Sequence, residues 1–284
     1  MSTPLLEIDD VSKVFVAPRR LGQRRPRPVH ALRNVTLTLG AREVLGVVGE
    51  SGSGKSTLAR TIVGLVKPTS GEVRLDGRPV DRMDRRERSR IVQLVFQDPY
   101  SSLDPTKTVR SLIEEPLKLH TDQTRTERLA TVHDLMASVA LPDRMMHVRP
   151  RQLSGGQRQR VAIARALALE PKVLIADEAV SALDVSTQAQ VINLLIKIAE
   201  TRDISYLFVS HDLRVVRHIA DRVAVMSSGR VVEAADTESI YTDPREEYTR
   251  KLLAAVPTLA PPPPTARPAE VHDGAPEFSA GGAQ

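Results

Sequence analysis

The sequence predicts an α/β fold built around a phosphate-binding loop. A short apolar, β-branched run at residues 43–48 precedes a glycine-rich loop, and helical spacing follows at residues 58–66. A second apolar run at residues 173–176 ends in two carboxylates, at the strand end where open α/β sheets bind ligands. Between these two runs, residues 99–159 lose the strand pattern and have a helical character.

The other elements are predicted from the same patterns. Within the helical segment, residues 124–139 are the clearest amphipathic stretch. Strands and helices alternate again over residues 161–235, and residues 236–256 are expected to form short closing helices. Residues 257–284 are dominated by Pro, Ala and Gly and are expected to be disordered. The strands predicted for an antiparallel β part are residues 5–15, 29–39 and 72–76.

The glycine-rich loop matches the pattern G-x-x-x-x-G-K-[ST] in full. Its glycines let backbone N–H groups turn toward phosphate oxygens at the positive end of the next helix. Lys55 is expected to reach the β- and γ-phosphates, and the Ser56 hydroxyl to join a Mg²⁺ shell. A merely flexible Gly/Ser turn is the alternative, which the strand, the spacing and both side chains argue against. The nucleotide-binding residues predicted here are Gly49, Ser51, Gly52, Gly54, Lys55, Ser56 and Thr57.

Asp177 and Glu178 stand at the carboxyl end of the second apolar run. Adjacent residues on a strand point to opposite sides, so we expect the two carboxylates to have different roles. Asp177 is predicted to hold Mg²⁺, and Glu178 to face the γ-phosphate and act as general base toward the attacking water. A solvated strand end is the alternative, which the preceding phosphate loop disfavours.

Three weaker signals lie where residues that sense a γ-phosphate are expected. Gln97 ends an apolar run, and its amide is predicted to contact both Mg²⁺ and the attacking water. His211 follows another apolar run and precedes a helix start, which favours a strand-to-helix switch loop over an ordinary surface or core histidine. Asp184 ends a turn shortly after the carboxylates and is predicted to cap the next helix.

A second turn with two glycines opens a helix predicted over residues 157–169; it reads Leu153-Ser154-Gly155-Gly156-Gln157. Ser154 can N-cap this helix or contact a phosphate, and the glycines allow close backbone approach. An ordinary capped amphipathic helix is the alternative. It leaves both glycines unexplained, because Gly costs about 1 kcal/mol in a helix relative to Ala. One phosphate loop binds one nucleotide, so the second turn indicates a nucleotide bound on another subunit.

Together these motifs resemble those of the ATP-binding-cassette (ABC) ATPases, which hold ATP between two head-to-tail domains. The resemblance covers roughly residues 5–256. It implies a P-loop NTPase (RecA-like) core with an antiparallel β subdomain and an α-helical signature subdomain at about residues 99–159. It also implies that Phe15 stacks on adenine and that the turn ending in Asp184 crosses the dimer interface. By the same resemblance, the residues that serve the ATP of the opposite subunit are Ser154, Gly155, Gly156 and Gln157.

Three further features narrow the resemblance: residues 96–105, a basic insertion at residues 18–28, and the segment 248–253 followed by Val256-Pro257. They are similar to the ATP-binding subunits of bacterial dipeptide and oligopeptide importers. Ala179-Val180 is a departure, because that family usually has Pro-Thr there. The resemblance implies a Mg²⁺-dependent ATPase at the cytoplasmic face of the cell membrane. Its implied partners are a second ATPase subunit, identical or paralogous, two membrane permease subunits and, indirectly, an extracytoplasmic solute-binding protein.

Composition fits this interpretation. The chain has 284 residues, 41% of them hydrophobic, which suffices for one large domain of about 250 residues. Cysteine is absent, which excludes disulfides and cysteine-ligated metals. No apolar run approaches the ~20 residues needed to span a bilayer, and no signal pattern precedes the first strand.

The net charge of +5 raises the question of nucleic-acid binding. The positive charge is spread along the chain, and aromatic residues, which would stack on bases, make up only 3%. We therefore expect no nucleic-acid partner. For the basic insertion itself, a solvated loop, a contact with membrane or partner subunits, and a nucleic-acid contact remain as interpretations.

Two rival classes share the main motifs. A chromosome-maintenance or DNA-repair ATPase would need a long heptad-bearing insertion between its halves, and none exists here. A ribosome-associated ABC protein normally carries two cassettes in one chain, and this chain has one. Among transporters, an exporter ATPase or an importer of another solute remains the alternative to peptide import.

Overall fold

The computed structural model describes residues 4–16 and 27–255. Most of the predicted basic insertion, residues 18–26, and the predicted disordered tail, residues 257–284, lie outside the described residues. Arg27 and Pro28, the last two residues of that insertion, are exposed. Among the helices of the described residues, none is both long and apolar enough to cross a bilayer.

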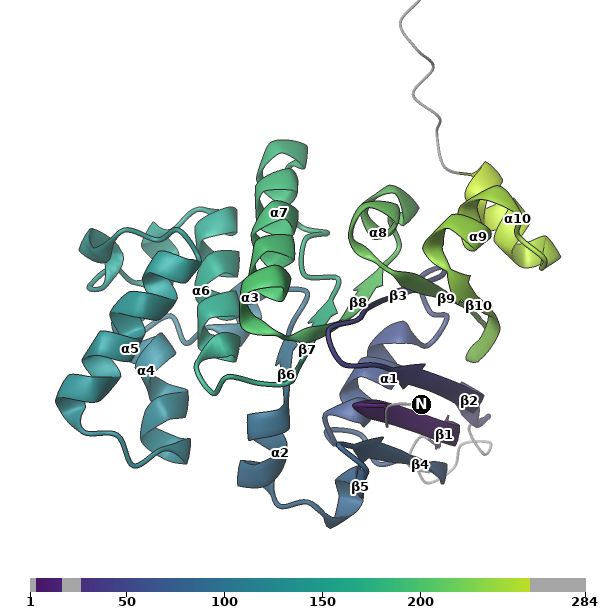
Figure 1. The fold of residues 1–284 in the computed structure, drawn as a ribbon, viewed down its shortest axis with the longest axis horizontal. Coiled ribbons are helices and arrows are strands. Elements are labelled where there is room, and N and C mark those ends of the chain that lie inside the picture. Colours follow the sequence, from purple (N-terminus) through teal and green to yellow (C-terminus); the bar gives the residue numbers. More distant parts are fainter. Residues whose placement is uncertain (1–3, 17–26, 256–284) are drawn as a thin grey trace, which may run out of the picture.

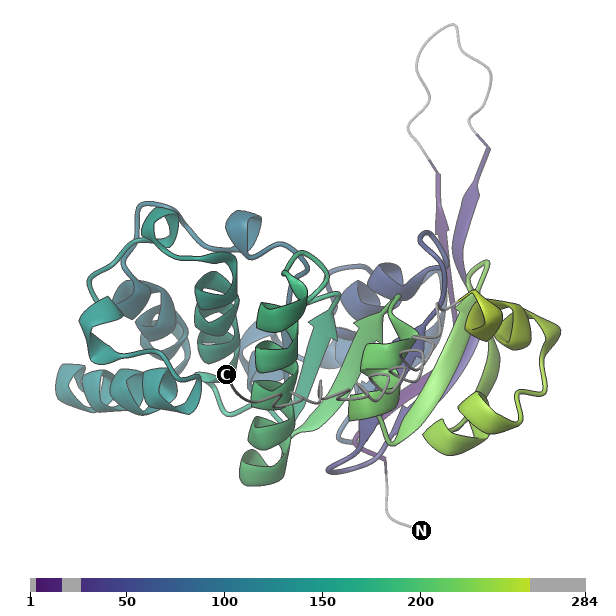
Figure 2. The same cartoon turned by 90° about the horizontal axis from the view of Figure 1, so that it is seen from above.

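One sheet has four antiparallel strands, and the other has six strands that are mostly parallel (Figure 1). In spatial order, the four-stranded sheet contains β2 (Val29–Leu39), β1 (Leu6–Phe15), β4 (Ser70–Leu75) and β5 (Arg78–Pro79). Leu6 pairs with Leu39 and Phe15 with Val29, so β1 and β2 form a long antiparallel pair. One end of this pair extends beyond the body of the molecule (Figure 2).

The six-stranded sheet carries four loops of functional interest at one edge. Its spatial order is β10 (Arg230–Asp236), β9 (Arg222–Ser227), β3 (Val44–Val48), β8 (Ser205–Ser210), β7 (Val173–Asp177) and β6 (Val92–Val95). All neighbouring pairs are parallel except β9 and β10. The carboxyl ends of β3, β6, β7 and β8 therefore meet at the same edge of the sheet.

The six-stranded sheet is buried on both faces, as its continuous apolar runs predict. Along β7, Val173 and Ile175 pack in one core cluster with α1 (Lys55–Ile62) and the four-stranded sheet. Leu174 and Ala176 pack in a second cluster with α6 (Gly155–Leu167), α7 (Val185–Arg202) and α8 (Leu213–Ile219). Alternate residues of one strand thus hold a helical layer on each side of the sheet (Figure 1).

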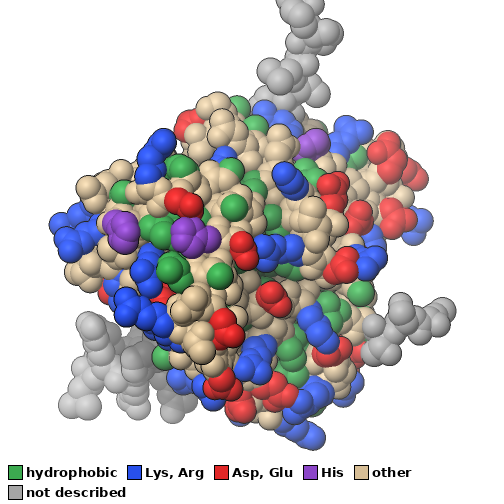
Figure 3. All heavy atoms as spheres, turned by 60° about the vertical axis from the view of Figure 1, so that its left-hand side comes forward, with side chains coloured by type: hydrophobic (Ala, Val, Ile, Leu, Met, Phe, Trp, Pro, Cys, Tyr) green, Lys and Arg blue, Asp and Glu red, His purple; other side chains and the backbone are tan. Residues whose placement is uncertain are grey.

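The middle of the chain forms the helices at the left of Figure 1. They are α3 (Pro99–Ser102), α4 (Val109–His120), α5 (Arg125–Ser138) and α6, with short 3₁₀ turns η2 (Asp143–Met145) and η3 (Pro150–Gln152) between the last two. Thr124 and Glu127 form a capping box that begins α5 where the amphipathic pattern predicts it. On this side of the molecule, basic side chains are interspersed with acidic and apolar ones (Figure 3).

Two helices have limits that differ from the predictions, and one helix was not predicted. The helix after the phosphate loop ends at Ile62 rather than Val66, because the chain turns through Gly64, which has φ of 69°. The helix predicted over residues 157–169 is α6, which starts earlier because Ser154 caps it at Gly155. The helix α2 (Arg85–Ile91), which follows the 3₁₀ turn η1 (Val80–Arg82), was not predicted.

After the last strand, α9 (Thr237–Thr242) and α10 (Glu247–Ala254) lie beside β10 (Figure 1).

Candidate active site

The phosphate loop, residues 49–57, connects β3 to α1, and neighbouring strands fix its path. A Cβ on Gly49 would lie 2.1 Å from the carbonyl oxygen of Met226 on β9, and one on Gly54 would lie 2.5 Å from that of Ala31 on β2. Gly54 also has φ of 107°. At both positions, therefore, only glycine permits the observed approach. The Gly229 N–H, in the turn between β9 and β10, donates to Ser53 O at 2.9 Å and holds the loop from a third side.

Lys55 begins α1 and is buried, with an exposed fraction of 4%. Its Nζ donates to the carbonyl oxygens of Gly49 at 2.7 Å and Glu50 at 2.9 Å. Burial lowers the pKa of Lys55, while the negative charges of Glu178 and Asp177 act in the opposite direction. An anion beside this ammonium group would stabilise its charged form, as expected of a lysine that contacts phosphate.

Asp177 is the last residue of β7 and is also buried. Its Oδ1 accepts a hydrogen bond from Ser56 Oγ at 2.9 Å. Burial raises the pKa of Asp177, and the nearby charge of Glu178 adds to this effect; Ser56, Arg60 and Lys55 oppose it. A carboxylate beside a hydroxyl is a suitable donor set for Mg²⁺, and a cation here would stabilise the ionised carboxylate. These residues therefore fit the metal that the sequence predicts.

Glu178 does not continue the strand, contrary to the prediction that Asp177 and Glu178 alternate along it. The strand ends at Asp177, and Glu178 adopts a left-handed backbone with φ of 48°. Its N–H donates to Val209 O on β8 at 2.9 Å, and its carbonyl accepts from Ser181 N and Oγ. The Asp177 carboxylate contacts Ser56 and the Glu178 carboxylate contacts Gln97, and a turn rather than strand alternation begins at Glu178.

The Glu178 carboxylate lies between the two residues predicted to sense a γ-phosphate. Gln97 Nε2 donates to Glu178 Oε2 at 2.8 Å. His211 Nδ1 lies 3.6 Å from Glu178 Oε1. Gln97 follows β6 and His211 follows β8, so the three side chains come from three parallel strands and converge at one edge.

The signature turn, residues 153–157, packs against α7 and the turn before it. Ser154 and Gln157 form a capping box, with Ser154 Oγ accepting from Gln157 N at 3.3 Å and Gln157 Oε1 accepting from Ser154 N at 2.9 Å. A Cβ on Gly156 would lie 2.3 Å from Thr187 Cγ2. Packing within this chain therefore explains Gly156, which corrects the view that a capped helix leaves both glycines without a reason. Gly155 and Ser154 remain exposed.

Asp184 caps α7, as predicted, and accepts from Thr187 N at 2.9 Å. The Ser186 hydroxyl and Thr187 lower the pKa of Asp184 to about 2, so this residue is ionised at neutral pH. Within the described part of the chain, no hydrogen bond joins Ser154 or Gln157 to the phosphate loop. The signature turn and Asp184 lie together, apart from the cluster around Lys55.

Phe15 lies at the end of β1, opposite Val29, and is 43% exposed. The ammonium nitrogen of Lys13 is 5.0 Å from the centre of its ring. Two residues further along β2 from Val29, the Ala31 carbonyl borders Gly54. The exposed ring is thus on the strand pair that flanks the phosphate loop.

Several supporting residues were not predicted as part of the site. Three such groups contact the phosphate loop or the signature turn: the turn at Gly229, the Thr187 methyl group, and the Tyr248 hydroxyl, which accepts from Glu50 N at 3.4 Å. No sequence pattern near the phosphate loop signals them, because each contact joins segments far apart in the chain.

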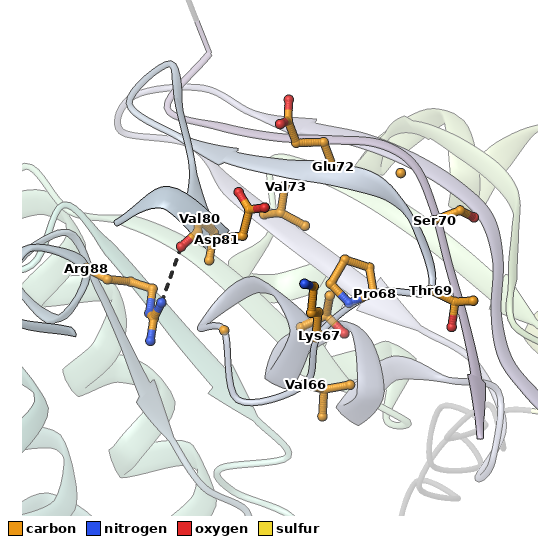
Figure 4. A pocket seen from close by; sticks show the side chains of 13 residues that line it. Val66, Lys67, Pro68, Thr69, Ser70, Glu72, Val73, Val80, Asp81 and Arg88 are labelled. Carbon is orange, nitrogen blue, oxygen red and sulfur yellow. Dashed lines mark hydrogen bonds between the residues drawn. The ribbon is translucent and has the colours of Figure 1, made fainter. Parts of the chain in front are cut away.

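A separate cavity of about 430 Å³ lies beyond the C-terminal end of α1, between β4, η1 and α2 (Figure 4). It is lined by basic and acidic side chains, including Lys67, Glu72, Asp81 and Arg88. The Arg88 guanidinium donates to Val80 O at 3.3 Å. Of the predicted site residues, none lines this cavity. The phosphate loop, residues 49–57, lies outside this cavity, at the edge of the six-stranded sheet.

Comparison with known proteins identifies the family of this chain. The model of the ABC transporter family matches residues 32–181. This chain belongs to the ABC transporter family. It is an ATP-binding cassette ATPase, and its fold class is the one predicted from the sequence.

Among its relatives is the oligopeptide transport ATP-binding protein AppF of Bacillus subtilis, which is 47% identical over 89% of this chain and 78% of AppF. Another is the dipeptide transport ATP-binding protein DppF of Haemophilus influenzae, 44% identical over 92% of this chain and 80% of DppF. A similar solved structure is the dimeric post-hydrolysis state of the ATP-binding cassette MJ0796 bound to ADP and Pi. It has a TM-score of 0.71 and 32% identity, and the match covers 82% of this chain and 98% of MJ0796.

We expect Lys55→Ala to abolish ATP hydrolysis and to weaken ATP binding, because Lys55 offers charge-assisted hydrogen bonds worth about 1.5–3 kcal/mol each. Phosphate release and binding of a fluorescent ATP analogue by the purified protein would measure both effects. Lys67→Ala, which removes an exposed lysine just beyond α1, is the matched control and should behave like the wild type. Unchanged turnover in Lys55→Ala would remove the phosphate-loop assignment.

Proposed function

We propose that this chain is the ATP-hydrolysing subunit of a membrane importer of dipeptides or oligopeptides. The observation that carries the hydrolytic part is the convergence of Gln97, Glu178 and His211 beside the buried Lys55 and Asp177. The solute class is supported by relatives whose names include oligopeptide or dipeptide transport. It is supported also by the segment at residues 96–105, which resembles that subfamily.

In this proposal, the residues of the cluster divide the chemistry between them. Glu178 accepts a proton from the attacking water, while Gln97 and His211 hold its carboxylate and that water in place. Lys55 and the N–H groups of residues 49–57 bind the phosphates. When bound at Ser56, Gln97 and Asp177, Mg²⁺ would neutralise charge on the phosphate oxygens. Phe15 offers an exposed aromatic face to adenine.

We further propose that Ser154, Gly155, Gly156 and Gln157 contact the ATP of a second ATPase subunit, with Asp184 at the interface between the two. Ser154 and Gly155 are exposed at the start of α6, where the helix dipole favours an anion. They make no hydrogen bond to their own phosphate loop within the described residues. A complete site would then contain the phosphate loop of one subunit and the signature turn of the other, whether the partner is identical or paralogous.

Ser154→Arg tests this division. We expect the variant to bind ATP as a monomer nearly as well as the wild type, but to lose turnover, because its bulk and charge obstruct only the opposite subunit's nucleotide. Binding to the monomer and steady-state hydrolysis would be measured side by side. Ser239→Arg, the same change on exposed α9, should preserve both. Collapse of nucleotide affinity in the Ser154→Arg monomer would show that the turn acts within its own chain.

The proposed permease contact is a groove of about 610 Å³ between α1, α2 and β6 on one side and α4 and α6 on the other. Its lining combines apolar side chains, among them Leu65 and Phe96, with the cations Arg85, Arg88 and Arg165; of the described residues that line it, none is acidic. Phe96 directly precedes Gln97, so a segment docked in the groove would lie next to Gln97, which contacts the proposed general base Glu178. Leu65, which lines the groove, exposes 63% of its surface, which favours an apolar partner there.

Leu65→Arg tests both the docking site and the solute. Adding a fourth arginine to the groove should prevent an apolar segment from docking, without changing the ATPase activity of the isolated subunit by more than about twofold. In cells that carry this variant in place of the native chain, we expect uptake of a radiolabelled tripeptide to fall by at least about tenfold. Ala137→Arg, on the exposed side of α5 and outside the groove, is the control.

Wild-type uptake with Leu65→Arg would contradict docking in the groove. If cells lacking this chain took up tripeptide normally but lost uptake of another solute, the assignment to peptides would be wrong.

A further inference from the structure

The closing helices α9 and α10 each carry a tyrosine whose hydroxyl contacts a loop of the candidate active site. The Tyr248 hydroxyl on α10 accepts a hydrogen bond from Glu50 N at 3.4 Å. The Tyr241 hydroxyl on α9 donates to Leu213 O, at the start of α8. Glu50 belongs to the phosphate loop, and Leu213 follows His211 after one intervening residue. The last two helices of the fold thus contact both the phosphate loop and the start of α8, which follows His211.

The contact of Tyr248 bears on one particular peptide group. The Glu50 N–H and the Gly49 carbonyl belong to the same planar unit. The carbonyl accepts from Lys55 Nζ at 2.7 Å, and the N–H donates to Tyr248. The two hydrogen bonds therefore fix this peptide from opposite sides. The position from which Lys55 reaches a phosphate depends on the peptide, and the peptide is oriented in part by Tyr248.

Tyr248 lies on a helix that is anchored to the rest of the fold. It packs against the main core cluster together with Leu252 and Leu253. The carboxylate of Glu233 on β10 accepts from Arg245 N at 2.8 Å and Glu246 N at 3.2 Å, which ties the start of α10 to the six-stranded sheet. A hydroxyl held in this way can restrain the phosphate loop.

Tyr241 holds the second loop in a similar way. Its ring packs against the core cluster and lies under the Arg217 guanidinium, 5.3 Å from the ring centre. Leu213 begins α8, which Asp212 caps by accepting from Arg214 N at 2.9 Å. The hydroxyl contact with Leu213 O therefore fixes the point at which the His211 loop becomes a helix.

We propose that α9 and α10 brace the hydrolysis site, with Tyr248 as a positioning residue of the phosphate loop and Tyr241 as a positioning residue of the His211 loop. This inference rests on the proposed roles of Lys55 and His211. The phosphate loop contacts ATP in the ground state and the transition state alike, so loss of the Tyr248 contact weakens binding. The His211 loop acts on the reacting phosphate, so loss of the Tyr241 contact slows turnover.

Tyr248→Phe and Tyr241→Phe, in the full chain, separate these effects. A neutral hydrogen bond corresponds to a change of about twofold to tenfold. For Tyr248→Phe we expect both the Kd for a fluorescent ATP analogue and the KM for ATP to rise by that factor, with kcat within about twofold of wild type. For Tyr241→Phe we expect kcat to fall by that factor, with Kd unchanged.

Two control variants distinguish positioning from stability. Tyr206→Phe removes a buried hydroxyl that has no hydrogen-bond partner in the described structure, and should leave Kd, KM and kcat unchanged. Leu135→Ala removes buried packing from α5, outside the brace, and no hydroxyl; it should lower the melting temperature while Kd stays at the wild-type value.

The proposal is overturned if Tyr248→Phe binds and hydrolyses ATP with wild-type Kd and KM, or if Leu135→Ala raises Kd as much as Tyr248→Phe does. It is overturned for the second loop if Tyr241→Phe keeps wild-type kcat. These failures differ from failure of the proposed function. Wild-type behaviour of Tyr248→Phe beside an inactive Lys55→Ala would remove only the brace, whereas an active Lys55→Ala would remove the phosphate-loop assignment itself.

Discussion

Lys55, Asp177 and Glu178 place one positive and two negative charges close together at the edge of a buried sheet. Burial disfavours the charged forms of Lys55 and Asp177, and their mutual attraction offsets this only in part. The rest of the site depends on keeping these groups in place. Strand β3 leads into the phosphate loop that carries Lys55, and β7 ends at Asp177. Glycines at positions 49 and 54 allow the loop to pack closely against β9 and β2. In the proposed function, a nucleotide phosphate beside Lys55 and a divalent cation beside Asp177 would supply the missing counter-charges.

A second constraint is that, within the described residues, no hydrogen bond joins Ser154 or Gln157 of the signature turn to the phosphate loop. The signature turn packs on α7 and the Asp184 turn, and its residues Ser154 and Gly155 are exposed. Its glycines divide into two roles. Gly156 makes room for Thr187 within the chain, whereas Gly155 is exposed at the helix start, where an anion would bind. Dimerisation is thus the simplest way in which both halves of the site can serve one ATP.

Much of this arrangement could be predicted from local patterns. The apolar runs at β3, β7 and β8 are strands, and the residues after them form the site because parallel strands end at a common edge. The caps at Ser154 and Asp184 were likewise predicted, since capping depends on near neighbours in the chain.

Contacts that depend on distant segments could not be predicted. The left-handed turn at Glu178 follows from its hydrogen bond to Val209 on another strand. The supports from Gly229 and Tyr248 likewise have no local sequence signal. The helix α2 was missed because its arginine-rich sequence buries no residue and so has no apolar periodicity.

The most direct test of the central claim is the effect of Glu178→Gln on oligomeric state and hydrolysis. The amide can still hold the attacking water but cannot accept its proton, so hydrolysis should slow by about 10²–10⁴-fold. ATP would then keep bridging two subunits, and light scattering with Mg-ATP should detect a dimer that is absent without nucleotide. With a paralogous partner, this dimer would form only when the second ATPase is added. Glu170→Gln, at an exposed residue that also has a left-handed backbone, is the control and should resemble the wild type. Hydrolysis by Glu178→Gln at the wild-type rate would contradict the account, because Glu178 would then not be the general base.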